Sequence, residues 1–97
     1  MDMESLMAQA QSLQTKISAA QESLSNTHVK GISENGAVIV DMTGKYDVVS
    51  VKIDESALSG GAQKLSEMVA SAYQDAKTKA DVLIDKTMSA ITGGMSE

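Results

Sequence analysis

The sequence GAVIVDMTGKYDVVSVKID, residues 36–54, decides the fold because two runs of β-branched residues meet in it at a glycine. Val, Ile and Thr pack well on a pleated surface, and such runs are nearly absent from the rest of the chain. Asn35-Gly36 is typical of a tight hairpin turn in which both residues take positive φ, and Gly44-Lys45 predicts a second turn. With a shorter run before it, the stretch predicts a three-stranded antiparallel meander over residues 27–54.

The pattern of apolar residues indicates which faces of this sheet are covered. The strands are expected at residues 27–33, 37–43 and 46–53. Val49, Val51 and Ile53 alternate with other residues on the third strand, so they share one face, which we expect to be buried. The second strand is apolar on both faces, with Val38, Val40 and Met42 opposed by Ala37 and Ile39. A central strand covered on both sides indicates a second copy of the chain.

The sequence on either side of the meander predicts two long helices. In residues 1–26 a heptad pattern is formed by Met3, Leu6, Ala10, Leu13, Ile17, Ala20 and Leu24. We expect Asp2 to cap this helix, and the pattern favours packing against another helix of the same chain or of a second copy. Residues 55–61 read as a linker with at most one helical turn, and residues 62–92 as the second helix. Gly93-Gly94 is expected to end that helix before a frayed tail, residues 93–97.

Composition limits the class of protein. The chain has 97 residues, no Cys, no Pro and no Trp, so it reads as one small α+β domain with an aliphatic core, for which self-association would supply missing stability. No stretch is long and apolar enough for a transmembrane helix, and a cytoplasmic protein is expected. Eight lysines and no arginine stand against thirteen acids, giving a net charge of −5 that lowers the expectation of nucleic-acid binding.

Residues for catalysis or metal binding are not evident in the sequence. His28 is the one histidine and reads as a surface residue, since no cysteine or second histidine could complete a zinc site. Asp81 and Asp85 are spaced i,i+4, as on a solvated helix face. Gly44-Lys45 is not followed by the pattern of a phosphate-binding loop. We therefore expect no enzymatic activity, no cofactor and no metal.

Three blocks in order give the chain a resemblance to a known family. LMAQAQSLQTK (residues 6–16), VKID (residues 51–54) and LSEMVASAYQDA (residues 65–76) resemble the opening helix, the final strand and the third block of the YbaB/EbfC family of bacterial nucleoid-associated proteins. The resemblance covers nearly the whole chain. It implies an α-β-β-β-α homodimer with projecting helices that binds duplex DNA in the nucleoid and influences gene expression, without enzymatic activity.

Two functional hypotheses follow. The first is a dimeric DNA-binding protein that contacts phosphates with helix lysines, for which the candidates are Lys16, Lys77, Lys79 and Lys86. Without arginine, the commonest bidentate recognition of guanine is not possible, so weak binding with little sequence selectivity is expected. The second is an acidic dimeric adapter that binds another protein through its helices. The residues expected in the core or dimer interface are Leu6, Leu13, Ile17, Val38, Val40, Val49, Val51, Ile53, Leu65 and Val69.

Overall fold

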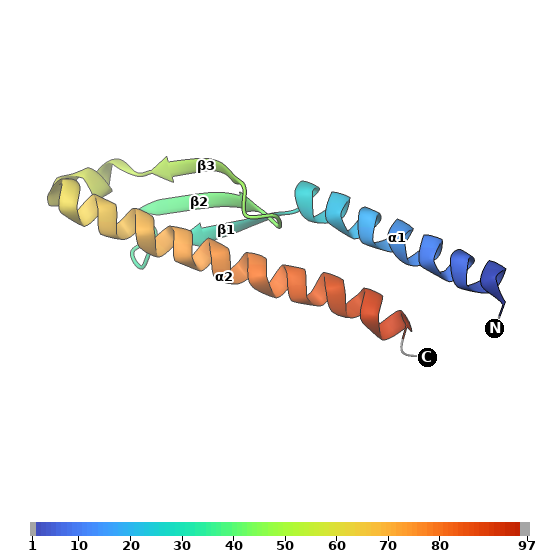
Figure 1. Cartoon of the computed structure of the whole chain (residues 1–97). Helices are drawn as coiled ribbons and strands as arrows, with labels where there is room; N and C mark the ends of the chain where they lie inside the picture. Colours follow the sequence, from blue (N-terminus) through green and yellow to red (C-terminus); the bar gives the residue numbers. More distant parts are fainter. Residues whose placement is uncertain (1, 96–97) are drawn as a thin grey trace.

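The computed structural model describes residues 2–95 and shows two long helices flanking a small sheet (Figure 1). The elements are α1 (Met3–Asn26), β1 (His28–Ile32), β2 (Val38–Thr43), β3 (Val48–Ile53), the 3-10 helix η1 (Glu55–Gly60) and α2 (Gly61–Met95). The predicted α-β-β-β-α order is confirmed. None of the described helices is both long and apolar enough to cross a membrane.

The core lies between one face of the sheet and α2. The strands are antiparallel in the order β1-β2-β3, so β2 is central. Val38, Val40 and Met42 of β2 are at most 1% exposed. They pack in one cluster with three fully buried alanines of α2, Ala72, Ala76 and Ala80. Because alanine projects little from a helix, the backbone of α2 lies close to the sheet.

Gly31 is the point of closest approach between β1 and α2. It pairs with Val40 in the sheet. A Cβ atom built on Gly31 would lie 2.0 Å from the Ala72 carbonyl oxygen and 2.6 Å from the Ala76 Cβ. No side chain fits at these distances, so glycine is required here for packing.

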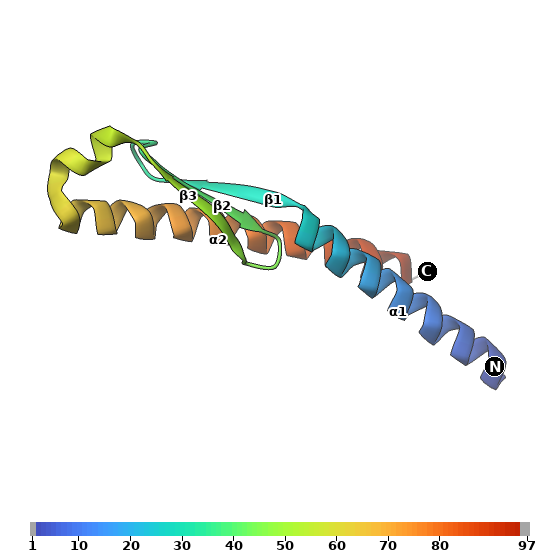
Figure 2. The same ribbon diagram turned by 90° about the horizontal axis from the view of Figure 1, so that it is seen from above.

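The two helices extend beyond the sheet at the same end of the molecule, where both termini lie (Figures 1 and 2). The chain is elongated, with extents of 68 × 20 × 15 Å. In α1 only Ala20 and Leu24 are buried, whereas Met3 is 76% and Leu6 49% exposed. The heptad pattern of α1 is therefore packed at its C-terminal end and open to solvent at its N-terminal end. We call α1 and the part of α2 after Ala80 the two arms.

The third strand differs from the prediction. The sequence predicts Val49, Val51 and Ile53 on one buried face, but these residues are 54%, 43% and 44% exposed. One reason is that α2 packs mainly against β1 and β2 and leaves β3 uncovered. The other is a β-bulge, since Met42 pairs with Val48 and Asp41 with Ser50, so that Val49 is an extra residue that breaks the alternation.

The turns also differ in detail. The β1–β2 connection spans five residues, and of the Asn35-Gly36 pair only Gly36 has a positive φ, at 74°. The predicted turn at Gly44-Lys45 is present but extends to Asp47, and its residue with positive φ is Tyr46, at 70°. The Asn35 side chain explains the first difference, because its Oδ1 accepts from the Ala37 N–H at 3.1 Å and closes a wider loop.

The ends of the helices agree with the prediction in part. Asp2 caps α1 by accepting from the Ser5 N–H at 2.8 Å, and the linker forms η1. The predicted end of α2 is wrong, since the helix continues through Gly93-Gly94 to Met95. Glycine favours a left-handed cap but is also free to adopt helical angles. The predicted fraying of Ser96 and Glu97 lies outside the described residues.

The Gly31 contact generates a stability prediction. Gly31→Ala should lower the free energy of unfolding by about 2 to 3 kcal/mol, since an added methyl in a tightly packed core forces the backbones apart. Urea unfolding followed by circular dichroism at one protein concentration measures this. Gly60→Ala is the matched control, because the atoms nearest to its Cβ would be side-chain atoms of Lys64, at 3.0 to 3.1 Å, and not backbone atoms. Equal stability of the two variants would contradict the packing argument.

Candidate nucleic-acid interface

The four candidate lysines are exposed and lie on the two long helices. Lys16 is on α1, and Lys77, Lys79 and Lys86 are on α2. At about 100° per residue, Lys79 and Lys86 point to the same side of α2, while Lys77 points to the opposite side. A single chain therefore does not gather the four ammonium groups on one surface.

Lys79 connects α2 to the edge of the sheet. Its Nζ donates to the Lys30 carbonyl oxygen of β1 at 2.7 Å and lies 3.0 Å from the Asp75 carboxylate. Asp75 in turn accepts from the Ile32 N–H at 2.9 Å. The backbone N–H holds the pKa of Asp75 below its ordinary value, with a smaller contribution from Lys79. The pair thus satisfies outward-facing backbone groups of β1 and covers that edge of the sheet.

Lys77 takes part in a second cluster, on the other flank of α2. Its Nζ lies 3.7 Å from the Asp81 carboxylate and 5.8 Å from the centre of the Tyr46 ring. The Tyr46 hydroxyl donates to the same carboxylate, and this bond is the main cause of the raised pKa of Tyr46. The Lys77 charge is therefore partly compensated within the chain.

Lys16 and Lys86 form no ion pair within residues 2–91, for which side chains are described. Lys16 borders a hollow of about 270 Å³ on α1 whose other lining residues are Gln9, Ser12 and Leu13. This side of α1 offers hydrogen-bonding groups without a carboxylate among the lining residues. Of the four candidates, these two lysines have the ammonium groups most available to a phosphate.

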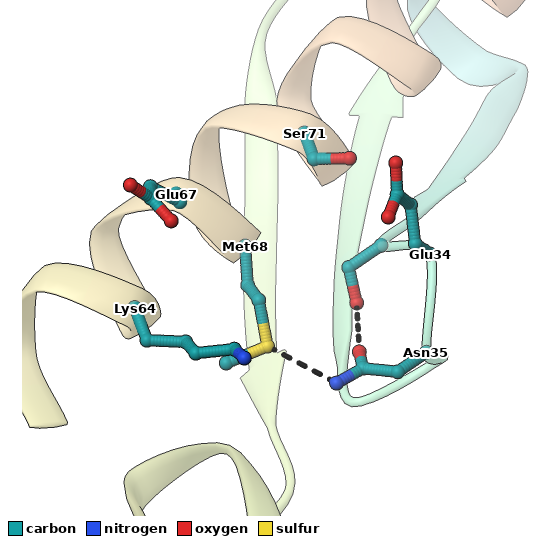
Figure 3. Close-up of a pocket in the computed structure, with 7 residues that line it drawn as sticks. Glu34, Asn35, Lys64, Glu67, Met68 and Ser71 are labelled. Atoms are coloured by element: carbon teal, nitrogen blue, oxygen red, sulfur yellow. Dashed lines mark hydrogen bonds between the residues drawn. The ribbon is translucent and has the colours of Figure 1, made fainter. Parts of the chain in front are cut away.

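A hollow of about 420 Å³ lies near the other end of α2, against the β1–β2 loop (Figure 3). Glu34 and Glu67 line it together with one cation, Lys64. Asn35 spans the hollow by donating from Nδ2 to the Met68 sulfur at 3.3 Å. With two carboxylates and one ammonium group among its lining residues, this hollow is unsuited to DNA phosphates. The bond from Asn35 to Met68 attaches the β1–β2 loop to α2.

The outer face of the sheet, away from α2, holds the histidine. His28 lies at the surface, as the sequence predicted, with its Nδ1 3.0 Å from Asp41 Oδ1 on the neighbouring strand. Among the described residues no group of three or more His, Cys, Asp or Glu side chains could hold a metal ion.

Sequence reasoning missed Asp75, Asp81 and Tyr46 as partners of the candidate lysines. The spacings Asp75–Lys79 and Lys77–Asp81 are both i,i+4 and could have indicated that each ammonium has an acidic neighbour on its own helix. The bonds that join this part of α2 to β1 and to the β2–β3 turn have no local sequence signal, because they link residues 35 to 49 positions apart.

The fold and the helix lysines define a small α+β protein of the α-β-β-β-α class. The chain belongs to the YbaB/EbfC DNA-binding family, whose model matches residues 1–95. The family is one of nucleoid-associated DNA-binding proteins, which is not an enzyme class.

Individual relatives agree with this assignment. The chain is 40% identical over 91 residues to the nucleoid-associated protein bll8115 of Bradyrhizobium diazoefficiens, covering 93% of this chain and 86% of that protein. It is 44% identical over 89 residues to the nucleoid-associated protein BRADO0764 of Bradyrhizobium sp. strain ORS 278, covering 91% and 84%. The crystal structure of the uncharacterized protein HP0035 from Helicobacter pylori shares the fold, with a TM-score of 0.74 at 21% identity over 100% and 99% of the two chains.

The Asp75 bonds generate a pH prediction. A lowered folded-state pKa stabilises the fold above the ordinary carboxyl pKa of 3.8, and this stabilisation is lost as the pH falls through the folded-state value. Asp75→Asn should therefore cost about 1 kcal/mol or less at pH 7, since the side chain is 39% exposed, and still less near pH 2. Urea unfolding at the two pH values measures the difference, and a cost that is larger in acid would contradict this role.

Proposed function

We propose that the chain forms a homodimer that binds duplex DNA through phosphate contacts from its helical arms. The observation that supports this most directly is the projection of two lysine-bearing helices beyond the core, with Lys16 and Lys86 free of ion pairs within residues 2–91. Membership of a DNA-binding family supports the same function. We also propose a location in the nucleoid and an effect on nucleoid organisation and gene expression, because the relatives are named nucleoid-associated proteins.

Charge supports weak binding with little sequence selectivity. Two of the four candidate lysines, Lys77 and Lys79, already have an aspartate partner. A net charge of −5 opposes the approach of a polyanion, and bound lysines must release counterions from the duplex to gain affinity. The chain also has no arginine to read guanine edges bidentately.

An uncovered apolar surface supports the homodimer. On β3 the exposed aliphatic residues are Val48, Val49, Val51 and Ile53. On α2 a hollow of about 660 Å³ is lined by Ala62, Leu65, Ser66, Val69, Ala70, Tyr73 and Gln74. Tyr73 lies one helical turn before Lys77, so this hollow is on the flank of α2 that faces the β2–β3 turn. We call these two sets of residues together the β3–α2 surface.

A second copy is the occupant that we propose for the β3–α2 surface. Aliphatic residues more than 40% exposed on most of an edge strand are unusual in a soluble monomer. The opposite edge, β1, is covered by Asp75 and Lys79, so β3 is the edge that remains for a partner. A symmetric pair would bury Val51 and Ile53 and bring the lysines of two chains onto one particle.

DNA binding is tested by fluorescence anisotropy with a labelled duplex. We expect binding at about 50 mM salt that weakens steeply as salt rises. Lys16→Gln and Lys86→Gln should each reduce affinity for all sequences alike. Each should also lower the slope of log affinity against log salt by about 1 if the replaced lysine neutralises one phosphate.

Lys64→Gln is the matched control for these variants, since it removes the same charge in the first turn of α2, at the end away from the arms. Affinity unchanged by the arm variants but reduced by Lys64→Gln would place the DNA contact elsewhere. No binding at high micromolar dimer would contradict the DNA-binding function. That result would favour the alternative, an acidic adapter, which the net charge supports and which would co-purify with a protein after nuclease treatment.

Dimerisation is tested by light scattering. We expect the mass of two chains at micromolar concentration and of one chain for Val51→Lys, because an ammonium group would be buried without a partner. Ser50→Lys is the matched control, since the neighbouring residue points to the outer face of the sheet, opposite Asp41. A wild-type monomer, or equal dissociation of both variants, would contradict the assignment of the interface.

A further inference from the structure

The β2–β3 turn, residues 43–47, touches the end of α1. The Gly44 N–H donates to the Leu24 carbonyl oxygen at 2.9 Å and to the Thr27 carbonyl oxygen at 3.0 Å. A Cβ atom on Gly44 would lie 2.8 Å from that Leu24 oxygen and 2.9 Å from the Leu24 Cδ2. The turn therefore lies directly on the last residues of α1 and satisfies one of the carbonyl groups that a helix leaves free at its C-terminus.

The same turn touches α2 through Tyr46. The Tyr46 backbone has a φ of 70°, and Tyr46 is the one described residue other than glycine with a positive φ. This conformation is uncommon for a side chain of this size, so the surrounding contacts must hold it. The Tyr46 hydroxyl donates to the Asp81 carboxylate, and Lys77 lies over the ring.

The turn is stiffened from within. The Tyr46 N–H donates to the Thr43 carbonyl oxygen at 3.0 Å. The N–H groups of Lys45 and Asp47 both donate to the Thr43 hydroxyl at 3.2 Å. Thr43 thus accepts hydrogen bonds from the N–H groups of Lys45, Tyr46 and Asp47. These bonds hold the turn as one rigid unit.

Apart from the β2–β3 turn, α1 contacts α2 and β2. Its first half is exposed, with Met3 at 76% and Met7 at 59%, and its buried residues, Ala20 and Leu24, belong to its last two turns. Leu24 is the residue against which Gly44 packs. The β2–β3 turn is bonded both to the end of α1, at Leu24, and to α2, at Asp81, so it is placed to influence the angle between α1 and the C-terminal part of α2.

We propose that the β2–β3 turn sets the angle between the two arms, with Tyr46 as the positioning residue that ties the turn to α2 through Asp81. Gly44 ties the turn to α1. The consequence for DNA rests on the proposed function, since the angle decides which phosphates the lysines of the two arms can reach together. The angle itself is a property of the protein alone and is tested without DNA.

The test measures the distance between the arms in the full-length protein. The chain has no cysteine, so Ala8→Cys and Ser89→Cys introduce one spin label on each arm. Dilution with unlabelled protein before pulsed electron resonance restricts the signal to pairs within one chain. We expect a narrow distance distribution for the otherwise unchanged protein, and a shifted or broadened one for Tyr46→Phe, which removes the hydroxyl and keeps the ring.

Thr87→Val is the matched control, because it removes a hydroxyl whose bond, to the Leu83 carbonyl oxygen at 2.8 Å, stays within α2. Asp81→Ala removes the acceptor of the same hydrogen bond as Tyr46→Phe, so it should change the distance distribution as Tyr46→Phe does. Circular dichroism checks that each variant is folded. Absorbance titration supplies an independent readout, since the bond to Asp81 raises the pKa of Tyr46 and the Asp81→Ala variant should lose this rise.

The outcomes separate this inference from the proposed function. Distributions for Tyr46→Phe and Asp81→Ala that superimpose on that of the starting protein would overturn the role of the turn, whether or not DNA binds. A broadened distribution with no DNA binding by the wild type would support the turn and contradict the proposed function. If the wild type binds DNA, Tyr46→Phe should weaken binding without a change of net charge.

Discussion

The contact of Gly31 with Ala72 and Ala76 is the constraint on which the rest of the structure depends. It brings the backbone of β1 onto α2 and so places the helix over β1 and β2. β3 is left outside, with aliphatic residues exposed on it. The close packing of β1 on α2 therefore leaves β3 exposed, and β3 is the strand that we propose binds a second copy. The same contact at Gly31 thus builds the core of one chain and leaves the surface proposed for the dimer.

The lysines that sequence reasoning grouped as one set have different roles in the structure. Lys79 seals the edge of β1, Lys77 belongs to the cluster around Tyr46, and Lys16 and Lys86 have no ion pair within residues 2–91. Since an ammonium group paired with a carboxylate gains less from a phosphate, the acids of α2 lower the affinity expected for DNA. Asp75, Lys79 and Asp81 also bond α2 to β1 and to Tyr46. The residues that weaken DNA binding would therefore also fix the position of α2 on the sheet.

The order of the elements could be predicted because it depends on local patterns: β-branched runs, a heptad pattern and the Asp2 cap. The exposure of Val51 could not, because it depends on where α2 lies across the sheet, and the bulge at Val49 has no signature in an alternating run. Gly31 was read as part of a strand, although a glycine inside a strand is a known sign of close backbone approach. For the candidate site, the four lysines stay predictions, and the bonds that position Lys77 and Lys79 could not be predicted because they join distant parts of the chain.

Whether the two arms carry the DNA contacts can be measured by titrating isotope-labelled protein with a short duplex and following the amide chemical shifts. We expect shifts to change around Lys16 on α1 and around Lys86 on α2, and the outer face of the sheet at Lys30 and Lys52 to be unaffected. Changes confined to the sheet, or no changes at low salt, would contradict the claim that the two arms carry the DNA contacts.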